Sequence, residues 1–203
     1  IGEKVNHFQE NDTIVAIATP RGVGGIAVVR VSGVDALKII SEITRSDWKK
    51  NIESHKAKLT ELYSPKDEII DQALVLPLLG KTSYTGEDTV EIFCHGGSIV
   101  PQGVVSACVD YGARPATAGE FTKRAFLNGK LSLDQSEAVV DLIHADSTIA
   151  ASASLGQLRG GTKNEILQIE QPLLALLSEL EGGLEFLDEE YPEMPRPKLL
   201  KYF

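Results

Sequence analysis

The sequence predicts an α+β domain followed by an α-helical domain. Runs of β-branched residues and helical patterns alternate irregularly as far as about Ala113, and helical patterns dominate after that residue. The chain has 203 residues, 42% of them hydrophobic and 24% charged, which is typical of a globular protein with one or two cores. We therefore expect a mixed α/β domain over residues 1–118 and the first part of a helical domain over residues 119–203.

The elements of the first domain follow from local composition. Runs such as TIVAIAT and IAVVRVS are rich in Val, Ile and Thr, which favour extended backbone. Apolar residues in helical spacing between Asp35 and Thr44 indicate a helix. The expected strands cover residues 13–19, 26–32, 57–63, 69–77 and 89–94, and the expected helices cover residues 35–44 and 97–111.

Start and stop signals for a short helix lie just after residue 114. Thr117 and Glu120 fit a capping box, with a hydroxyl at the cap and a carboxylate three residues later. Asn128 and Gly129 tolerate left-handed backbone, which is typical of a helix end. We therefore expect a short helix between these two signals.

A second capping box, Ser132 to Gln135, predicts a long amphipathic helix after the first. Lys130 lies in the turn between the two helices, with Lys123 and Arg124 close in sequence. A lone surface lysine is usually only solvated. One that is fixed between two capped helices is better placed to hold an anion.

The last third of the chain predicts further helices. Gly160 and Gly161 interrupt the pattern and indicate a bend, and Pro172 predicts either a kink or a late helix start. A leucine-rich face after residue 166 is typical of core packing in a helical bundle. Residues 188–192 should end this helix, and Pro195 and Pro197 indicate a linker.

Composition excludes several classes of protein. A net charge of −9 argues against a dedicated nucleic-acid-binding domain, although a local basic patch remains compatible with it. Two cysteines are too few for a disulfide framework and fit a reducing compartment. The sequence shows no membrane-length apolar run and no signal peptide, so we expect a cytoplasmic location. Because the chain starts at Ile1, the natural N-terminus is expected to lie upstream.

Two glycine-containing segments resemble nucleotide-binding motifs but fail in context. Residues 22–27 match G-x-G-x-x-A, yet the following residues favour a strand, whereas the dinucleotide fingerprint must open a helix. Gly80-Lys81-Thr82 lacks the glycine that a P-loop needs at position 75. The four histidines have no metal-ligand spacing. We therefore expect no catalytic residue and no metal site in this chain.

Three charged residues on separate rigid elements are the candidate binding residues. Arg30 interrupts an apolar strand, so it either points outward as an edge-strand charge or enters a polar site, and spacing alone favours the first. Glu91 either faces water on a half-exposed sheet or accepts two N–H donors from a flat heterocycle. Lys130 would add a second cation. Sequence spacing leaves open whether the three converge.

Three segments, taken in their order along the chain, resemble those of a known family, and the resemblance extends from residue 12 to about residue 190. They are DTIVAIATPRGVGGIAVVRVSG, SYTGEDTVEIFCHGG and GEFTKRAFLNGKLSLDQSEAVVDLI. In these segments the chain resembles the N-terminal part of the MnmE (TrmE) family of tRNA-modification GTPases. The resemblance implies an N-terminal domain of the aminomethyltransferase kind, which binds 5-formyltetrahydrofolate and forms a homodimer.

By this resemblance the folate contacts fall on Arg30, Glu91 and Lys130. Glu91 would accept hydrogen bonds from the pterin amino and ring N–H groups. Arg30 and Lys130 would hold acceptor or carboxylate groups of the folate.

The resemblance also implies partners and further cofactors. The family modifies the wobble uridine of tRNA at ring carbon five together with MnmG, which carries FAD, and its GTPase domain uses GTP, Mg²⁺ and K⁺. This sequence ends at Phe203 before any P-loop, so we expect no GTP hydrolysis by the chain alone. Its helical faces should then need returning helices, another copy or a separate segment. The alternative hypothesis is a dimerisation and docking module without catalysis.

Overall fold

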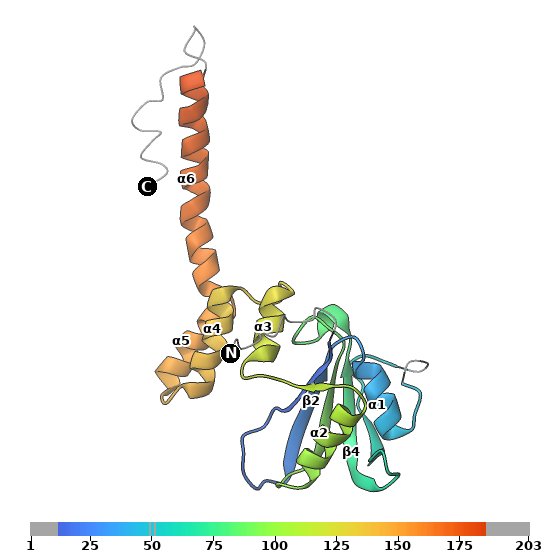
Figure 1. Ribbon diagram of the computed structural model, residues 1–203. Coiled ribbons are helices and arrows are strands. Elements are labelled where there is room, and N and C mark those ends of the chain that lie inside the picture. The colour runs from blue at the N-terminus through green and yellow to red at the C-terminus, as the bar shows by residue number, and fades with distance from the viewer. Residues whose placement is uncertain (1–11, 49, 51, 186–203) are drawn as a thin grey trace, which may run out of the picture. The chain divides into compact units, whose positions relative to one another are not determined.

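The computed structural model describes residues 12–48, 50 and 52–185 (Figure 1). The chain divides into two compact units between Ser132 and Leu133, and each unit is described by itself. The helix end predicted at residues 188–192 and the linker predicted at Pro195 and Pro197 lie outside the described residues. No helix in the described part is both long and apolar enough to cross a membrane.

The first unit is built on a sheet of six strands in the order β3-β4-β5-β2-β1-β6. All neighbouring strands pair antiparallel except β1 and β6, which are parallel. The strands are β1 (Ile14–Ile17), β2 (Ile26–Ser32), β3 (Lys58–Tyr63), β4 (Ile69–Leu78), β5 (Thr89–His95) and β6 (Arg114–Pro115). The five strands predicted from composition are therefore confirmed, whereas β6 has no sequence signal because it is short and contains a proline.

Two helices, α1 (Ala36–Thr44) and α2 (Val100–Asp110), pack against the sheet and against each other, so they cover the same face (Figure 1). Alternate residues of the central strands point into this layer, as the period of two in a strand requires. In β2 these are Ala27, Val29 and Val31, and in β5 they include Val90 and Ile92, all of them buried. The core of the unit therefore lies between the helices and this face.

The residues that alternate with the core positions point to the opposite face of the sheet. Arg30 on β2 and Glu91 on β5 belong to this set and are partly exposed. Because β2 lies between β5 and β1, Arg30 is not on an edge strand. The interpretation of Arg30 as an edge-strand charge is therefore wrong.

Helix α3 (Glu120–Leu127) belongs to the first unit, whereas the sequence placed the domain boundary after Ala118. The predicted capping box forms only in part. The Glu120 carboxylate accepts from the backbone N–H of Thr117 at 2.7 Å, but the cap position is Gly119, and the Thr117 hydroxyl donates to the same carboxylate. The helix ends at Leu127, and Gly129 adopts positive φ, as the sequence predicts.

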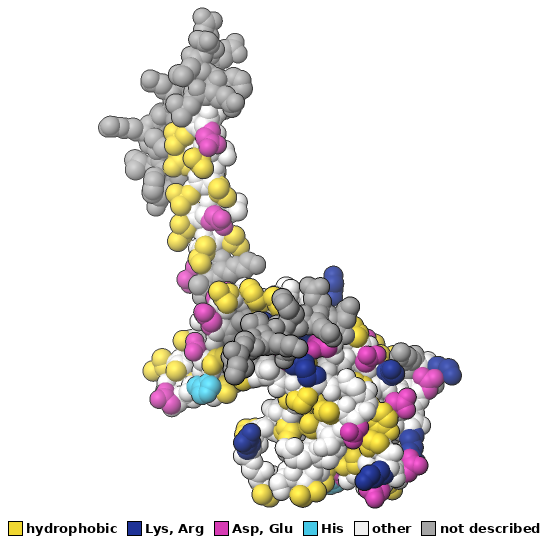
Figure 2. Space-filling model, in the orientation of Figure 1, with side chains coloured by type: hydrophobic (Ala, Val, Ile, Leu, Met, Phe, Trp, Pro, Cys, Tyr) yellow, Lys and Arg dark blue, Asp and Glu magenta, His cyan; other side chains and the backbone are white. Residues whose placement is uncertain are grey.

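The second unit consists of three helices, α4 (Leu133–His144), α5 (Thr148–Leu158) and α6 (Gly161–Glu185). Gly160, with a φ of 84°, lies between α5 and α6, and Gly161 is the first residue of α6. Helix α6 runs through Pro172, so the predicted late start is wrong. Apolar side chains remain exposed along α6, as the space-filling view shows (Figure 2), and they include Ile166, Ile169, Leu173, Leu174, Leu177 and Leu180.

Candidate functional site

An ion pair between Arg30 and Glu91 lies at the middle of the sheet face that α1 and α2 leave open. The register of β2 against β5 places the two residues directly opposite each other. Arg30 donates to Oε1 of Glu91 from Nε at 3.0 Å and from Nη2 at 2.8 Å. The side chains are 23% and 16% exposed, so the pair is accessible but shielded.

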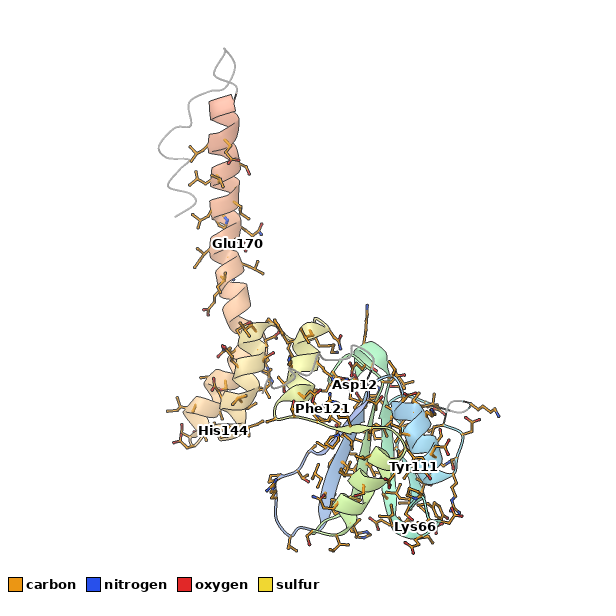
Figure 3. The ribbon with its side chains drawn as sticks, in the orientation of Figure 1. Asp12, Lys66, Tyr111, Phe121, His144 and Glu170 are labelled. Atoms are coloured by element: carbon orange, nitrogen blue, oxygen red, sulfur yellow. The ribbon has the colours of Figure 1, made fainter. Side chains whose placement is uncertain are left out.

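Two aromatic rings flank this pair. The Arg30 guanidinium carbon lies 5.1 Å from the ring centre of Tyr84 and 5.4 Å from that of Phe121. Tyr84 comes from the loop before β5, and Phe121 lies in the first turn of α3 (Figure 3). The Tyr84 hydroxyl and the Thr122 hydroxyl are hydrogen-bonded at 2.9 Å, which ties the loop to the helix.

The Arg30–Glu91 pair leaves hydrogen-bonding capacity unused. Both contacts from Arg30 converge on Oε1 of Glu91, and within the described residues no hydrogen bond is found for Oε2 of Glu91 or Nη1 of Arg30. A carboxylate oxygen accepts and a guanidinium nitrogen donates. The pair therefore offers one acceptor atom, Oε2 of Glu91, and one donor atom, Nη1 of Arg30, to a ligand.

Lys130 contacts the loop that carries Tyr84 and not the ion pair itself. Its Nζ donates to the backbone carbonyl of Lys81 at 2.5 Å. The neighbouring Asn128 donates through Nδ2 to the carbonyl of Thr85 at 2.8 Å. The structure thus brings Arg30 and Glu91 into contact, whereas Lys130 contacts the loop that carries Tyr84.

An ionic cluster around the buried Glu120 supports the loop and α3. It consists of Asp12, Glu87, Arg114, Glu120 and Arg124 (Asp12 is labelled in Figure 3). Arg124 binds Asp12, lies 3.2 Å from Oε2 of Glu87 and lies 3.3 Å from Oε1 of Glu120. Arg114 donates from Nη2 to Oε1 of Glu120 at 2.6 Å. The cluster therefore connects β6, α3 and the loop before β5.

Glu120 is the centre of this cluster, and its side chain has no exposed surface. Burial would raise its pKa, but the hydrogen bonds from Arg114 and Thr117 outweigh burial and lower the pKa of Glu120 to about 2. The same hydrogen bonding to Glu120 raises the pKa of Arg114. Glu120 and Arg114 therefore stay charged over the physiological pH range.

A separate cleft of about 1090 Å³ lies between the β1–β2 turn and the start of α2. Gly22, Gly24, Gly96 and Ser98 contribute to its lining. The glycine turn connects two strands and opens no helix, which agrees with the rejection of a dinucleotide site. The cleft contains none of the three predicted site residues.

Comparison with known proteins relates both units to one family. Residues 13–130 match the family model described as GTP-binding protein TrmE N-terminus, and residues 133–202 match the MnmE helical domain. The chain belongs to the MnmE (TrmE) family. An α+β domain followed by a helical domain is therefore confirmed as the fold class.

Individual members of the MnmE family show the same relationship. A tRNA modification GTPase MnmE of Flavobacterium psychrophilum is 44% identical over 182 residues, which cover 89% of this chain and 39% of the relative. The protein of the same name from Francisella tularensis is 45% identical over 179 residues, covering 88% and 39%. The chain thus spans about two fifths of the length of these MnmE relatives.

Sequence reasoning from the MnmE resemblance selected the charged residues of the site but missed its aromatic ones. Tyr84 and Phe121 carry no signal by themselves, since aromatic residues usually serve a core. A usable signal was available in the loop SYTGED, where a large aromatic residue stands among turn-forming residues. The cluster of Glu87 and Arg124 was also missed because its members are far apart in sequence.

Proposed function

We propose that this chain is the folate-binding and helical portion of a tRNA-modifying protein, with its folate site at Arg30 and Glu91. The observation that carries the proposal is the half-used ion pair on the open face of the sheet, flanked by two aromatic rings. A pterin ring is flat and carries adjacent N–H donors and acceptors along one edge. It therefore complements one free carboxylate oxygen and one free guanidinium nitrogen.

The proposed roles differ from the first interpretation in one respect. Glu91 has only Oε2 left for the pterin, because Oε1 is held by Arg30. Arg30 orients Glu91 and donates from Nη1 to an acceptor of the ring. Lys130, next to Lys81, places positive charge where the glutamate tail of the folate can be neutralised.

The role of the whole protein is also part of the proposal. When bound, a formyltetrahydrofolate supplies a one-carbon unit for modification of the tRNA wobble uridine at ring carbon five. The MnmG partner, homodimerisation through the first unit, a cytoplasmic location, and GTP hydrolysis with Mg²⁺ and K⁺ elsewhere in the full-length protein complete this picture. The names of the relatives, tRNA modification GTPase MnmE, support it.

Calorimetric titration of the 203-residue chain with 5-formyltetrahydrofolate tests the proposal. Glu91→Gln removes the charge of the acceptor, so we expect affinity to fall about 10- to 100-fold, as for a lost charge-assisted hydrogen bond. Glu42→Gln, at an exposed position of α1, is the matched control and should bind as the unmodified chain does.

Two results would contradict the proposal. One is the absence of saturable binding by the unmodified chain, combined with melting that depends on protein concentration, which favours the docking module. The other is unchanged affinity in Glu91→Gln, which would place the folate elsewhere.

A further inference from the structure

We infer that Tyr84 and Phe121 form an aromatic clamp that contacts the heterocyclic end of the ligand beside the Arg30–Glu91 pair. The inference rests on the proposed function for the identity of the ligand, and it specifies that the two rings bind the heterocyclic end of that ligand. It assigns a binding role to two residues outside the charged trio.

The position of the two rings is the first argument. Both ring centres lie less than 6 Å from the guanidinium carbon of Arg30, at 5.1 Å for Tyr84 and 5.4 Å for Phe121. A guanidinium at this distance is held by the ring electrons. Tyr84 and Phe121 are only partly buried, so their rings are not part of the hydrophobic core. Both rings therefore lie beside the guanidinium that carries the free donor of the pair.

The rigidity of the clamp is the second argument. The hydroxyl of Tyr84 is hydrogen-bonded to Thr122, the residue after Phe121, so the loop that carries one ring is tied to the helix that carries the other. Arg124, one turn along α3, binds Glu87 at the other end of the loop. A pre-positioned aromatic surface binds a flat ring with little loss of conformational freedom.

The combination of aromatic rings with the free atoms of the Arg30–Glu91 pair is the third argument. An aromatic ring offers a stacking face to any flat heterocycle, whereas the Oε2 atom of Glu91 and the Nη1 atom of Arg30 are selective for the edge of that heterocycle. A pterin supplies both the face and the edge. The p-aminobenzoylglutamate tail lacks a ring edge with adjacent donors and acceptors, so the clamp should prefer the pterin end.

Another arginine of the same unit provides a contrast. The Arg45 guanidinium carbon lies 3.9 Å from the ring centre of Tyr63, but its partner Asp67 is exposed, and among the described residues no second ring is found next to Arg45. That contact is an ordinary surface interaction. It provides a matched control for the removal of a ring next to an arginine.

The test uses two probes, pterin (2-amino-4-oxopteridine) and 5-formyltetrahydrofolate, titrated into the 203-residue chain by calorimetry and ligand-observed NMR. Tyr84→Leu and Phe121→Leu should each weaken pterin binding about 5- to 100-fold, because each removes one stacking face. Tyr63→Leu and Phe126→Leu, the latter on the exposed side of α3, should bind pterin as the unmodified chain does.

Two further measurements isolate the role of the ring. Tyr84→Phe keeps the ring and loses only the bond to Thr122, so its affinity for pterin should exceed that of Tyr84→Leu. If a leucine variant does not fold, intermolecular nuclear Overhauser effects between pterin and the ring protons of Tyr84 or Phe121 in the unmodified chain decide the question. Their presence supports the clamp, and their absence from a saturated complex overturns it.

The remaining outcomes separate the clamp from the proposed function. Pterin binding that needs both rings, without binding of 5-formyltetrahydrofolate, supports the clamp and contradicts the folate proposal. Folate binding that needs Glu91 but is unchanged in folded Tyr84→Leu and Phe121→Leu overturns the clamp alone. A chain that binds neither probe overturns both.

Discussion

The first unit contains two groups of charged residues that use the same chemistry in opposite ways. In the cluster around Glu120, two arginines and three carboxylates bind one another, and the central carboxylate has no exposed surface. In the pair of Arg30 and Glu91, one carboxylate oxygen takes both contacts, and the side chains stay 23% and 16% exposed.

This difference distinguishes a structural cluster from a binding site. A buried charge is tolerated only when it is paired and hydrogen-bonded, so the Glu120 cluster serves to hold α3 and the loop in place. A pair with a free donor and a free acceptor can bind a ligand without first breaking an internal contact. The comparison predicts that mutations in the cluster affect stability, and that mutations in the pair affect binding.

The largest effect is expected for Glu120→Gln. It leaves the buried Arg124 and the partly exposed Arg114 without their central counter-charge, so the free energy of unfolding of the first unit should fall by about 3–5 kcal/mol. Urea unfolding followed by the fluorescence of Trp48, the single tryptophan of the chain, measures it. The control Glu42→Gln should change stability by less than about 0.5 kcal/mol. Equal effects in the two variants would show that the cluster is not structural.

The pH dependence of stability should come next. The folded pKa of Glu120 is about 2, below its ordinary value of 4.5, so the ionised carboxylate stabilises the fold above that ordinary value. The unfolding free energy should therefore fall by about 3 kcal/mol between about pH 5 and pH 2. Glu120→Gln should remove this part of the fall. Parallel pH profiles for the two proteins would contradict the assignment.

A smaller loss is expected for Gly86→Ala, in the loop that joins the two groups. Gly86 has a φ of +82°, and an added Cβ would lie 3.1 Å from Asn128 Cβ and Lys130 Cγ. Left-handed strain and crowding together should cost about 1–3 kcal/mol in urea unfolding. Gly129→Ala is the control, since Gly129 has a φ of +68° but open space around it. The additional loss of unfolding free energy in Gly86→Ala over Gly129→Ala measures the contact of the loop at Gly86 with Asn128 and Lys130. Equal losses would mean that this contact is weak.

The smallest effect on stability is expected for Glu91→Gln. The pair is partly exposed, so its loss should lower the unfolding free energy by no more than about 1 kcal/mol. The same fluorescence assay checks this value. A loss as large as that of Glu120→Gln would remove the distinction between the two groups.

The sequence predicted local structure better than the assembly of the site. Alternation in β2 and β5 correctly placed Arg30 and Glu91 away from the core positions, because side-chain direction in a strand depends only on position parity. Which strands are neighbours was not predictable, since pairing is decided by packing across the whole domain. The flanking rings of Tyr84 and Phe121 depend on that pairing and were missed for the same reason.

The predicted capping box forms only in part, and of the two alternatives predicted for Pro172 the late helix start is wrong. Of the two hydrogen bonds of a capping box, only the one from the backbone N–H of Thr117 to the Glu120 carboxylate forms. The position of this carboxylate is set by its ion pairs with Arg114 and Arg124. Pro172 lacks one backbone donor, yet α6 continues through it. The capping rule was overridden by ion pairs, and the rule that proline interrupts a helix was overridden by the helical residues on either side of Pro172.

The direct opposition of Arg30 and Glu91 across β2 and β5 has a consequence for how the sequence can change in length. Insertions between β3 and β4, at residues 64–68, enlarge a loop and leave the pair intact. A single deletion inside β5, by contrast, exchanges its two faces, so that Glu91 enters the helix-covered layer and an apolar neighbour takes its place. Insertions and deletions are therefore tolerated in the connecting loops. Within β2 and β5 they are not, because the strand register that places Arg30 opposite Glu91 would be lost.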